Sequence, residues 1–111
     1  MVSSYVPEQG DIVWLDSTPQ LGHEQRGRRP AIVLSKKPYN KKIGLALFCP
    51  ITSKEKGYPF EVKITANKIS GCVLSDQVKS LDWTQRNIEF IEKSSNTIIE
   101  EVLNKILVLI K

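Results

Sequence analysis

The chain is poor in the residues that usually hold metal ions or form disulfide frameworks. Its 111 residues include one histidine, His23, and two cysteines, Cys49 and Cys72, which stand far apart and form no C-x-x-C pair. No H-E-x-x-H or P-loop sequence occurs, and no serine lies in a nucleophile-elbow pattern. We therefore expect no metal and no cofactor, and we expect two buried thiols rather than a disulfide. Four carboxylates that can ligate magnesium also fit strand ends and turns, namely Asp11, Asp16, Asp76 and Asp82.

Long apolar runs are absent as well. No run approaches the ~20 residues of a membrane span, and the start, MVSSYVPEQGDI, lacks the charged and apolar regions of a secretory signal. We therefore expect a cytoplasmic protein without membrane contact. Hydrophobic residues make up 41% and charged residues 25% of the chain, a composition typical of folded domains. The length predicts one domain, residues 1–111.

Basic residues are concentrated in one part of the chain. The formal net charge is +4, but residues Gly22 to Phe60 hold nine basic and two acidic side chains. From Glu61 to Lys111 the two signs are balanced at seven each. A basic surface built by one segment suits a phosphate polymer or an acidic protein as partner.

Short apolar segments bounded by turn residues predict five or six strands. They cover residues 10–17, 29–35, 44–52, 60–65, part of 72–83, and 88–92. In the segment 72–83 we expect Val78 and Leu81 to face the core, and the polar stretch KKPYNKK (36–42) is expected to be a loop. The almost continuous apolar run 44–52 is typical of a central strand.

The C-terminal segment changes to a helical period. Apolar residues recur from Ile98 to Ile110 at spacings of three and four, and either Ser95 or Thr97 can cap the helix. The sequence thus predicts a mainly β domain closed by a C-terminal α-helix.

Two polar segments carry the candidate chemistry. In GHEQRGRRPAIVL, Arg28 and Arg29 directly precede a predicted strand, and a guanidinium fork there can grip a phosphate. Glu24 can lie over the same cleft, or it can simply pair with an arginine on the surface. Thr52 and Ser53 end the central strand. If the strands of Arg29 and Thr52 are neighbours, a guanidinium and a hydroxyl meet at a phosphodiester site that needs no metal.

Five segments resemble, in order and spacing, the MazF/PemK (Kid) family of toxin endoribonucleases. They are GDIVWLD, GHEQRGRRPAIVLS, CPITSK, GYPFEV and LSDQVKSLDW. The segment TQRNIEFIEK lacks a glycine seen in some members, and Arg26 and Arg28 lie where members vary. These departures concern the recognised RNA sequence more than the fold.

The resemblance implies an SH3-like, partly open β-barrel of five to six antiparallel strands that acts as a homodimer. It implies sequence-specific, metal-independent cleavage of single-stranded RNA, including mRNA, and neutralisation by an antitoxin whose acidic segment fills the RNA groove. By position, Arg29 and Thr52 match the family's catalytic pair, and Glu24 matches a loop acid implicated in activity.

The expected reaction is attack of a ribose 2′-hydroxyl on the adjacent phosphate, which leaves a 2′,3′-cyclic phosphate and a 5′-hydroxyl end. We expect Arg29 to stabilise the phosphorane, Thr52 to donate a hydrogen bond to it, and Glu24 to act as the base. The residues expected to bind RNA are His23, Gln25, Arg26, Arg28, Ser53, Lys54, Lys56, Gln77 and Lys79. Because a histidine pair is needed for acid–base catalysis of the ribonuclease A kind, the lone His23 is expected to tune substrate contact. Trp14 and Trp83 can stack on bases, but packing in the core or at a dimer interface is expected of them.

Two other functions are compatible with parts of this pattern. Gyrase-poisoning toxins resemble this barrel, but they have an aromatic, glycine-containing C-terminal tail, whereas this chain ends in ILVLIK. A non-catalytic RNA-binding barrel would satisfy the charge distribution alone.

Overall fold

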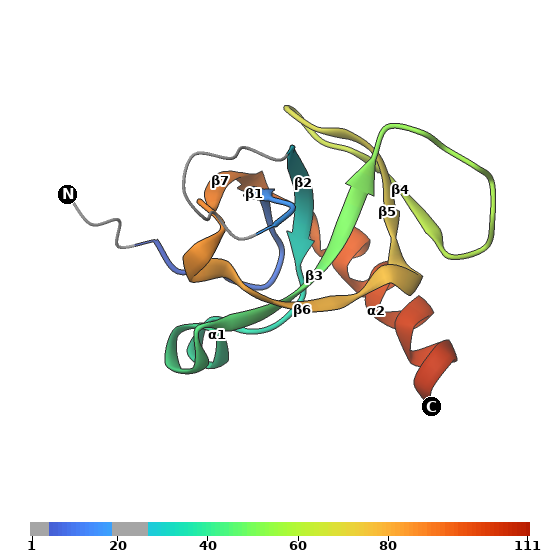
Figure 1. Cartoon of the computed structure of the whole chain (residues 1–111). Helices are drawn as coiled ribbons and strands as arrows, with labels where there is room; N and C mark the ends of the chain where they lie inside the picture. The colour runs from blue at the N-terminus through green and yellow to red at the C-terminus, as the bar shows by residue number, and fades with distance from the viewer. Residues whose placement is uncertain (1–4, 19–26) are drawn as a thin grey trace.

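Seven strands, two α-helices and two short 3₁₀ turns make up the computed structural model, which describes residues 5–18 and 27–111 (Figure 1). In chain order the elements are β1 (Asp11–Asp16), β2 (Arg28–Val33), α1 (Lys37–Ile43), β3 (Leu45–Thr52), β4 (Glu61–Thr65), β5 (Ser70–Leu74), η1 (Ser75–Gln77), β6 (Lys79–Asp82), η2 (Trp83–Gln85), β7 (Glu89–Lys93) and α2 (Asn96–Ile110).

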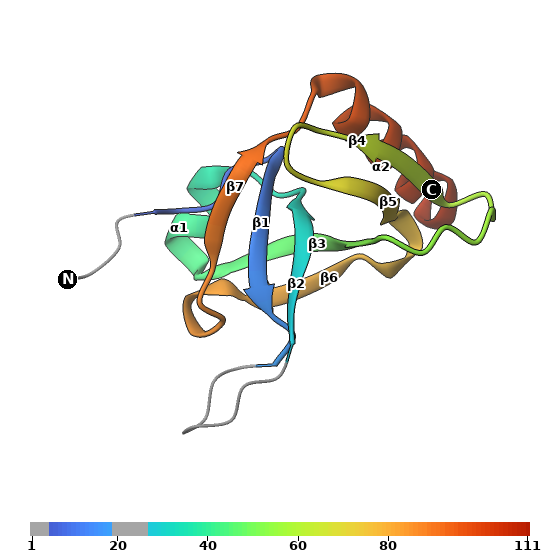
Figure 2. The same ribbon diagram turned by 90° about the horizontal axis from the view of Figure 1, so that it is seen from above.

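The strands form one curled antiparallel sheet in the order β4-β5-β3-β2-β1-β7, with β6 also paired to β3 (Figures 1 and 2). Strand β3 lies at the centre, as its apolar run predicts, because it pairs with β2, β5 and β6 along its length. The curl produces a half-barrel with β4 and β7 as its two end strands. The predicted mainly β, SH3-like class with a C-terminal helix is confirmed.

Two hydrophobic clusters lie on the two faces of the curled sheet. Successive strand residues point to opposite faces, so Ile12 and Ile32 enter one cluster, while their neighbours Val13 and Val33 enter the other. Helix α2 adds Ile99 and Val102 to the first cluster. Its N-cap is Ser95, whose Oγ accepts a hydrogen bond from the Ile98 N–H at 3.3 Å.

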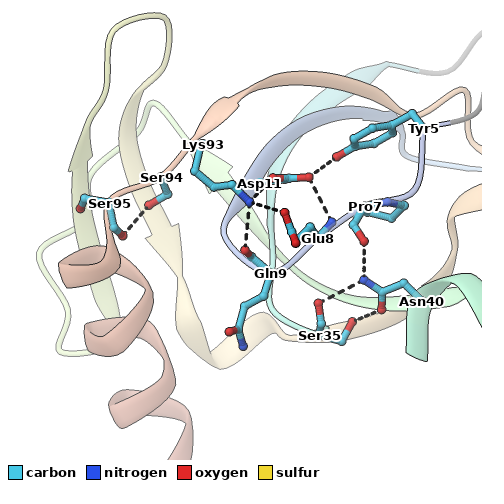
Figure 3. Close-up of polar contacts among 10 residues, drawn as sticks. All are labelled: Tyr5, Pro7, Glu8, Gln9, Asp11, Ser35, Asn40, Lys93, Ser94 and Ser95. Atoms are coloured by element: carbon cyan, nitrogen blue, oxygen red, sulfur yellow. Dashed lines mark hydrogen bonds and ion pairs between the residues drawn. The ribbon is translucent and has the colours of Figure 1, made fainter. Parts of the chain in front are cut away.

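The segment expected to be a loop after β2 is instead helix α1. Asn40, a residue that usually favours turns, is completely buried there, and its amide donates to the carbonyl oxygen of Pro7 at 2.8 Å (Figure 3). Ser35 Oγ donates to Asn40 Oδ1 at 2.6 Å, and the helix ends at Gly44, whose φ is 81°. Bonds to distant residues therefore override the local turn propensity.

The segment 72–83 differs from its prediction too. It contains the end of β5, the turn η1 and strand β6, which accounts for seven strands rather than five or six. The extra turn breaks the alternation of side chains, so Val78 is exposed (37%) and its predicted core position is wrong. Leu81 does pack against the second cluster.

A buried carboxylate ties the N-terminal segment to β1 and β7 (Figure 3). Asp11 accepts hydrogen bonds from the Tyr5 hydroxyl at 2.5 Å and from Lys93 Nζ at 2.7 Å, and Lys93 also contacts Glu8 at 3.1 Å. Burial and the bond to Asp11 raise the pKa of Tyr5 above its ordinary value. Burial opposes the charge of Lys93, but the bonds to Asp11 and Glu8 raise its pKa.

Both cysteines are buried free thiols, as the sequence predicts. Burial raises the pKa of the Cys49 thiol to about 12, so this thiol stays protonated and behaves as a small apolar residue. Across the described ranges, no helix has the length and apolarity required to cross a membrane.

Candidate active site

The pairing of β2 with β3 brings Arg29 and Thr52 together. The ladder sets Ala31 opposite Pro50 and Val33 opposite Phe48. Arg29 and Thr52 lie two residues beyond the last pair of this ladder, at the same end of the two strands. Both residues line one cavity of about 740 Å³, a size typical of ligand sites. The condition that the sequence left open, that these strands are neighbours, is therefore met.

The cavity walls come from β1, β2, the end of β3 and the turn between β4 and β5. The lining residues are Trp14, Arg28, Arg29, Pro30, Ile51, Thr52, Ser53, Lys54, Lys68, Ile69 and Ser70. Four of them are cationic and none is acidic. Such a lining favours an anionic ligand.

The two adjacent arginines in this wall have different surroundings. Arg28 forms ion pairs through Nη1 with Asp16 at 3.0 Å and through Nη2 with Glu89 at 3.2 Å, which joins β2 to β1 and β7. Arg29 pairs with Leu15 of β1 through its main chain, but its exposed side chain forms no hydrogen bond or ion pair with any residue that the structure describes. Its guanidinium lies over Gly27, where an added methyl group would approach Nη1 to 3.0 Å. The Arg29 guanidinium is therefore available to an incoming ligand.

The Thr52 hydroxyl is held by a local bond that leaves its hydrogen available. Oγ1 accepts the backbone N–H of Lys54 at 3.1 Å, so the O–H can donate into the cavity. Strand β5 passes close to this peptide at Gly71, whose φ is 148°. A Cβ at position 71 would overlap the carbonyl oxygen of Thr52. Only glycine permits this approach, which fixes the backbone that carries the hydroxyl.

The other residues predicted to bind RNA do not all lie in the main cavity. Ser53 and Lys54 line the main cavity, and Lys79 lines a smaller one of about 150 Å³ that shares Arg29 with it. Lys56 lies on the exposed loop after β3 and Gln77 lies in η1, and neither lines these two cavities. The predictions for His23, Glu24, Gln25 and Arg26 fall outside the described residues.

Two further residues line the cavity: Trp14, for which base stacking was only an alternative, and Lys68, which was not among the predicted contacts. Trp14 is half-buried, lines the cavity and is not part of either hydrophobic cluster, whereas Trp83 packs against the second cluster. Lys68 enters the wall from the β4–β5 turn. The sequence TANKIS (65–70) is typical of an ordinary polar turn, and nothing in it predicts that Lys68 lines a cavity.

The four aspartates considered as magnesium ligands serve four separate structural contacts. Asp11 pairs with Lys93, and Asp16 pairs with Arg28. Asp76 accepts a hydrogen bond from Tyr58 at 2.7 Å, and Asp82 caps η2. The one cluster of possible metal ligands within the described residues consists of Glu55, Glu61 and Cys72, none of which lines the main cavity.

A curled β half-barrel with a C-terminal helix and a cation-lined cleft at Arg29 and Thr52 defines a class of small toxin proteins. Residues 8–110 match the model of the family described as PemK-like, MazF-like toxin of type II toxin-antitoxin system. The chain belongs to this family, and the resemblance found in its sequence is confirmed.

Similar proteins include one from Escherichia coli and one from Deinococcus radiodurans. The endoribonuclease toxin MazF of Escherichia coli (strain K12) is 51% identical over 86 residues, which cover 78% of each chain. The crystal structure of MazF from Deinococcus radiodurans aligns with a TM-score of 0.86 and 50% identity, covering 96% of this chain and 97% of that one. A MazE-MazF structure from the same organism aligns with a TM-score of 0.85 and 45% identity over 96% of each chain.

Proposed function

We propose that this protein is a sequence-specific, metal-independent endoribonuclease toxin that cleaves single-stranded RNA, including mRNA. The observation that carries the proposal is an unpaired guanidinium, that of Arg29, in the same cleft as the hydroxyl of Thr52, a cleft whose charged lining residues are all cationic. The MazF relative, named an endoribonuclease toxin, supports the reaction class. The MazE-MazF structure supports neutralisation by a cognate antitoxin, for which we propose an acidic segment that occupies the same cleft.

The proposed reaction is a transesterification within the RNA. The 2′-oxygen forms a bond to the adjacent phosphorus while the bond from phosphorus to the 5′-oxygen breaks, which yields a 2′,3′-cyclic phosphate and a 5′-hydroxyl. The 2′-hydroxyl proton goes to a base, for which we propose Glu24, and the leaving 5′-oxygen takes a proton from solvent water. DNA has no 2′-hydroxyl and is therefore excluded as a substrate.

Arg29 and Thr52 would act on the pentavalent intermediate. The guanidinium donates two hydrogen bonds to non-bridging oxygens and offsets their charge, and the Thr52 hydroxyl donates another. Because the pKa of arginine exceeds about 12, charge stabilisation suits Arg29 better than proton donation.

The remaining cations would hold the RNA on both sides of the reacting phosphate. Lys54 lies in the main cavity and Lys79 in the adjoining one, and we propose that the predicted RNA-binding residues outside the two cavities extend this path. Trp14 offers a ring on which a base can stack. We further propose that the protein acts as a homodimer in the cytoplasm.

The test is to incubate the purified protein with a long unstructured RNA in the presence of a chelator and to map the ends of the products. We expect cleavage at a short recurring sequence, with 5′-hydroxyl ends, that is lost in Arg29→Ala. Intact RNA that remains bound would identify a non-catalytic binder instead. Gyrase-dependent breakage of DNA, with the RNA left intact, would identify a gyrase poison.

A further inference from the structure

The turn between β4 and β5 carries a cation into the cleft. Lys68, Ile69 and Ser70 all line the main cavity, and the turn is closed by a hydrogen bond from the Ala66 N–H to the Ile69 carbonyl at 2.8 Å. The Lys68 side chain is exposed, and its ammonium group forms no bond or ion pair with any described residue. Lys68 therefore resembles Arg29 in its availability to an anion.

A carboxylate from another strand fixes this turn. Glu92 accepts three backbone hydrogen bonds from it: Oε1 accepts from Asn67 at 3.2 Å, and Oε2 accepts from Lys68 at 2.7 Å and Ile69 at 3.1 Å. Hydrogen bonds to a charged acceptor are stronger than those between neutral groups. With both oxygens bonded to main-chain N–H groups, Glu92 holds the turn without forming an ion pair with the Lys68 ammonium.

These bonds connect the two ends of the half-barrel. Strands β4 and β7 stand at opposite ends of the strand order, and Figure 2 shows the β4–β5 turn beside the end of β7. Glu92 lies in β7 opposite Ile12 of β1, two residues before Trp14 in the cleft wall. The main chain of Lys68 is thereby fixed relative to β1, which contributes Trp14 to the cleft wall, while its side chain is exposed to solvent.

We propose that Lys68 binds the RNA backbone beside the reacting phosphate and that Glu92 is the positioning residue that holds it there. The inference rests on the proposed function, since it concerns the same cleft. A lysine is suited to this task because its ammonium contacts phosphate as a point charge without requiring one orientation. The carboxylate of Glu92 acts only through the turn and does not touch the RNA.

The test uses an RNA with a mapped cut site, blocked there by a single 2′-O-methyl group so that binding is measured without cleavage. The dissociation constant is measured over a range of salt concentrations for the wild type, Lys68→Ala, Glu92→Gln and the double variant. We expect Lys68→Ala to bind roughly twofold to fivefold more weakly. The slope of log affinity against log salt concentration is negative, and it should become shallower by about 0.7, the value for one phosphate contact to a single strand.

Glu92→Gln should weaken binding in the same way, because it removes the negative charge and one of the two acceptor oxygens that hold the main chain of Lys68. If Glu92 acts through Lys68, the double variant binds no more weakly than Lys68→Ala alone. Lys68→Arg should retain the salt slope, since it keeps the charge. Lys63→Ala, which removes an exposed lysine of β4 that does not line the cleft, should change neither quantity.

Two results would overturn the inference while the proposed function survives. The first is an unchanged affinity and salt slope in Lys68→Ala while the wild type cleaves the unblocked RNA. The second is a loss of RNA affinity on Glu92→Gln that is as large in the Lys68→Ala background as in the wild type. This result would show that Glu92 affects binding by a route that does not involve Lys68. A wild type that neither binds nor cleaves RNA would overturn the proposed function and this inference together.

Discussion

The edge formed by β1 and β7 differs from the cleft at the ends of β2 and β3 in how charges are paired. At the edge, two cations each contact two carboxylates: Lys93 of β7, and Arg28 of β2, which lines the cleft but pairs with Asp16 of β1 and Glu89 of β7. In the cleft, Arg29, Lys54 and Lys68 have no carboxylate partner among the described residues. The ion pairs at the edge are therefore expected to stabilise the fold, whereas the cations without a carboxylate partner in the cleft fit the anionic ligand that we propose. Substitutions in the two regions should therefore separate stability from activity.

The largest expected effect is on catalysis, in the cleft. Arg29→Ala should lower kcat by roughly 10²- to 10³-fold, the range seen when a preorganised donor to a developing oxyanion is removed. Its melting temperature should stay close to that of the wild type, because the guanidinium forms no hydrogen bond or ion pair with the described residues. Single-turnover cleavage and thermal unfolding measure the two quantities. A variant with normal cleavage and a low melting temperature would reverse the assignment of the two regions.

Gly71→Ala should be the next most severe change in the cleft. The added methyl group displaces the peptide of Thr52 and with it the start of the loop that carries Lys54, so we expect kcat to fall roughly 10- to 100-fold. Gly57→Ala is the matched control, since Gly57 also has a positive φ, 81°, but has no atom within contact distance of an added Cβ. If both variants lose stability and cleavage equally, the effect is backbone strain and not the position of Thr52.

At the edge, Arg28→Ala should destabilise the fold and leave the chemistry largely intact. The substitution leaves the buried Asp16 carboxylate without its guanidinium partner, which costs about 1.5–3 kcal/mol of unfolding free energy. Denaturant unfolding measures that loss, and cleavage is compared well below the melting temperature. An unchanged unfolding free energy would contradict the structural role. RNA affinity in the same variant tests the prediction that Arg28 also binds RNA.

Thr52→Val replaces the hydroxyl in the cleft by a group of the same shape. We expect cleavage to slow by roughly fivefold to tenfold, the value of about one hydrogen bond, with an unchanged melting temperature. Thr52→Ser keeps the hydroxyl and should cleave at a rate close to that of the wild type. A large fall in the melting temperature of Thr52→Val would instead assign Thr52 to the scaffold.

The smallest expected effect is an alkaline loss of stability at the edge. The pKa values of Tyr5 and Lys93 are both raised in the folded protein. Their contribution is complete below the unfolded pKa, about 10 for each, and is lost as the pH rises through the raised values. Tyr5→Phe should lower the melting temperature slightly at neutral pH. Above about pH 10, the melting temperature of this variant should fall less steeply with pH than that of the wild type. Equal alkaline slopes for the variant and the wild type would count against this bond.

The sequence predicted the elements that depend on local pattern. The apolar run of β3 and the helical period of α2 were sufficient for both elements, and the pairing of β2 with β3 is the reason that Arg29 and Thr52 line one cavity. Helix α1 was missed because Asn40 is satisfied by Pro7, far away in the chain, and no local pattern reports such a bond.

The two arginines illustrate what sequence alone could not resolve. Arg28 and Arg29 are adjacent and chemically identical, and both lie in the wall of the cleft. Their surroundings differ because the register of β1 and β7 brings Asp16 and Glu89 to Arg28 only. Lys68 was missed for a similar reason, since its position depends on a turn held by the remote Glu92.

The most direct test of the proposed chemistry is a comparison of two RNAs that differ by one oxygen atom. An RNA with a mapped cut site and a copy with a single 2′-deoxyribose on the 5′ side of that bond are incubated with the wild-type protein in chelator. We predict that both bind with similar affinity and that only the all-ribose RNA is cleaved at the site. Cleavage of the deoxy copy at the same bond would contradict attack by the ribose hydroxyl and, with it, the role assigned to Arg29 and Thr52.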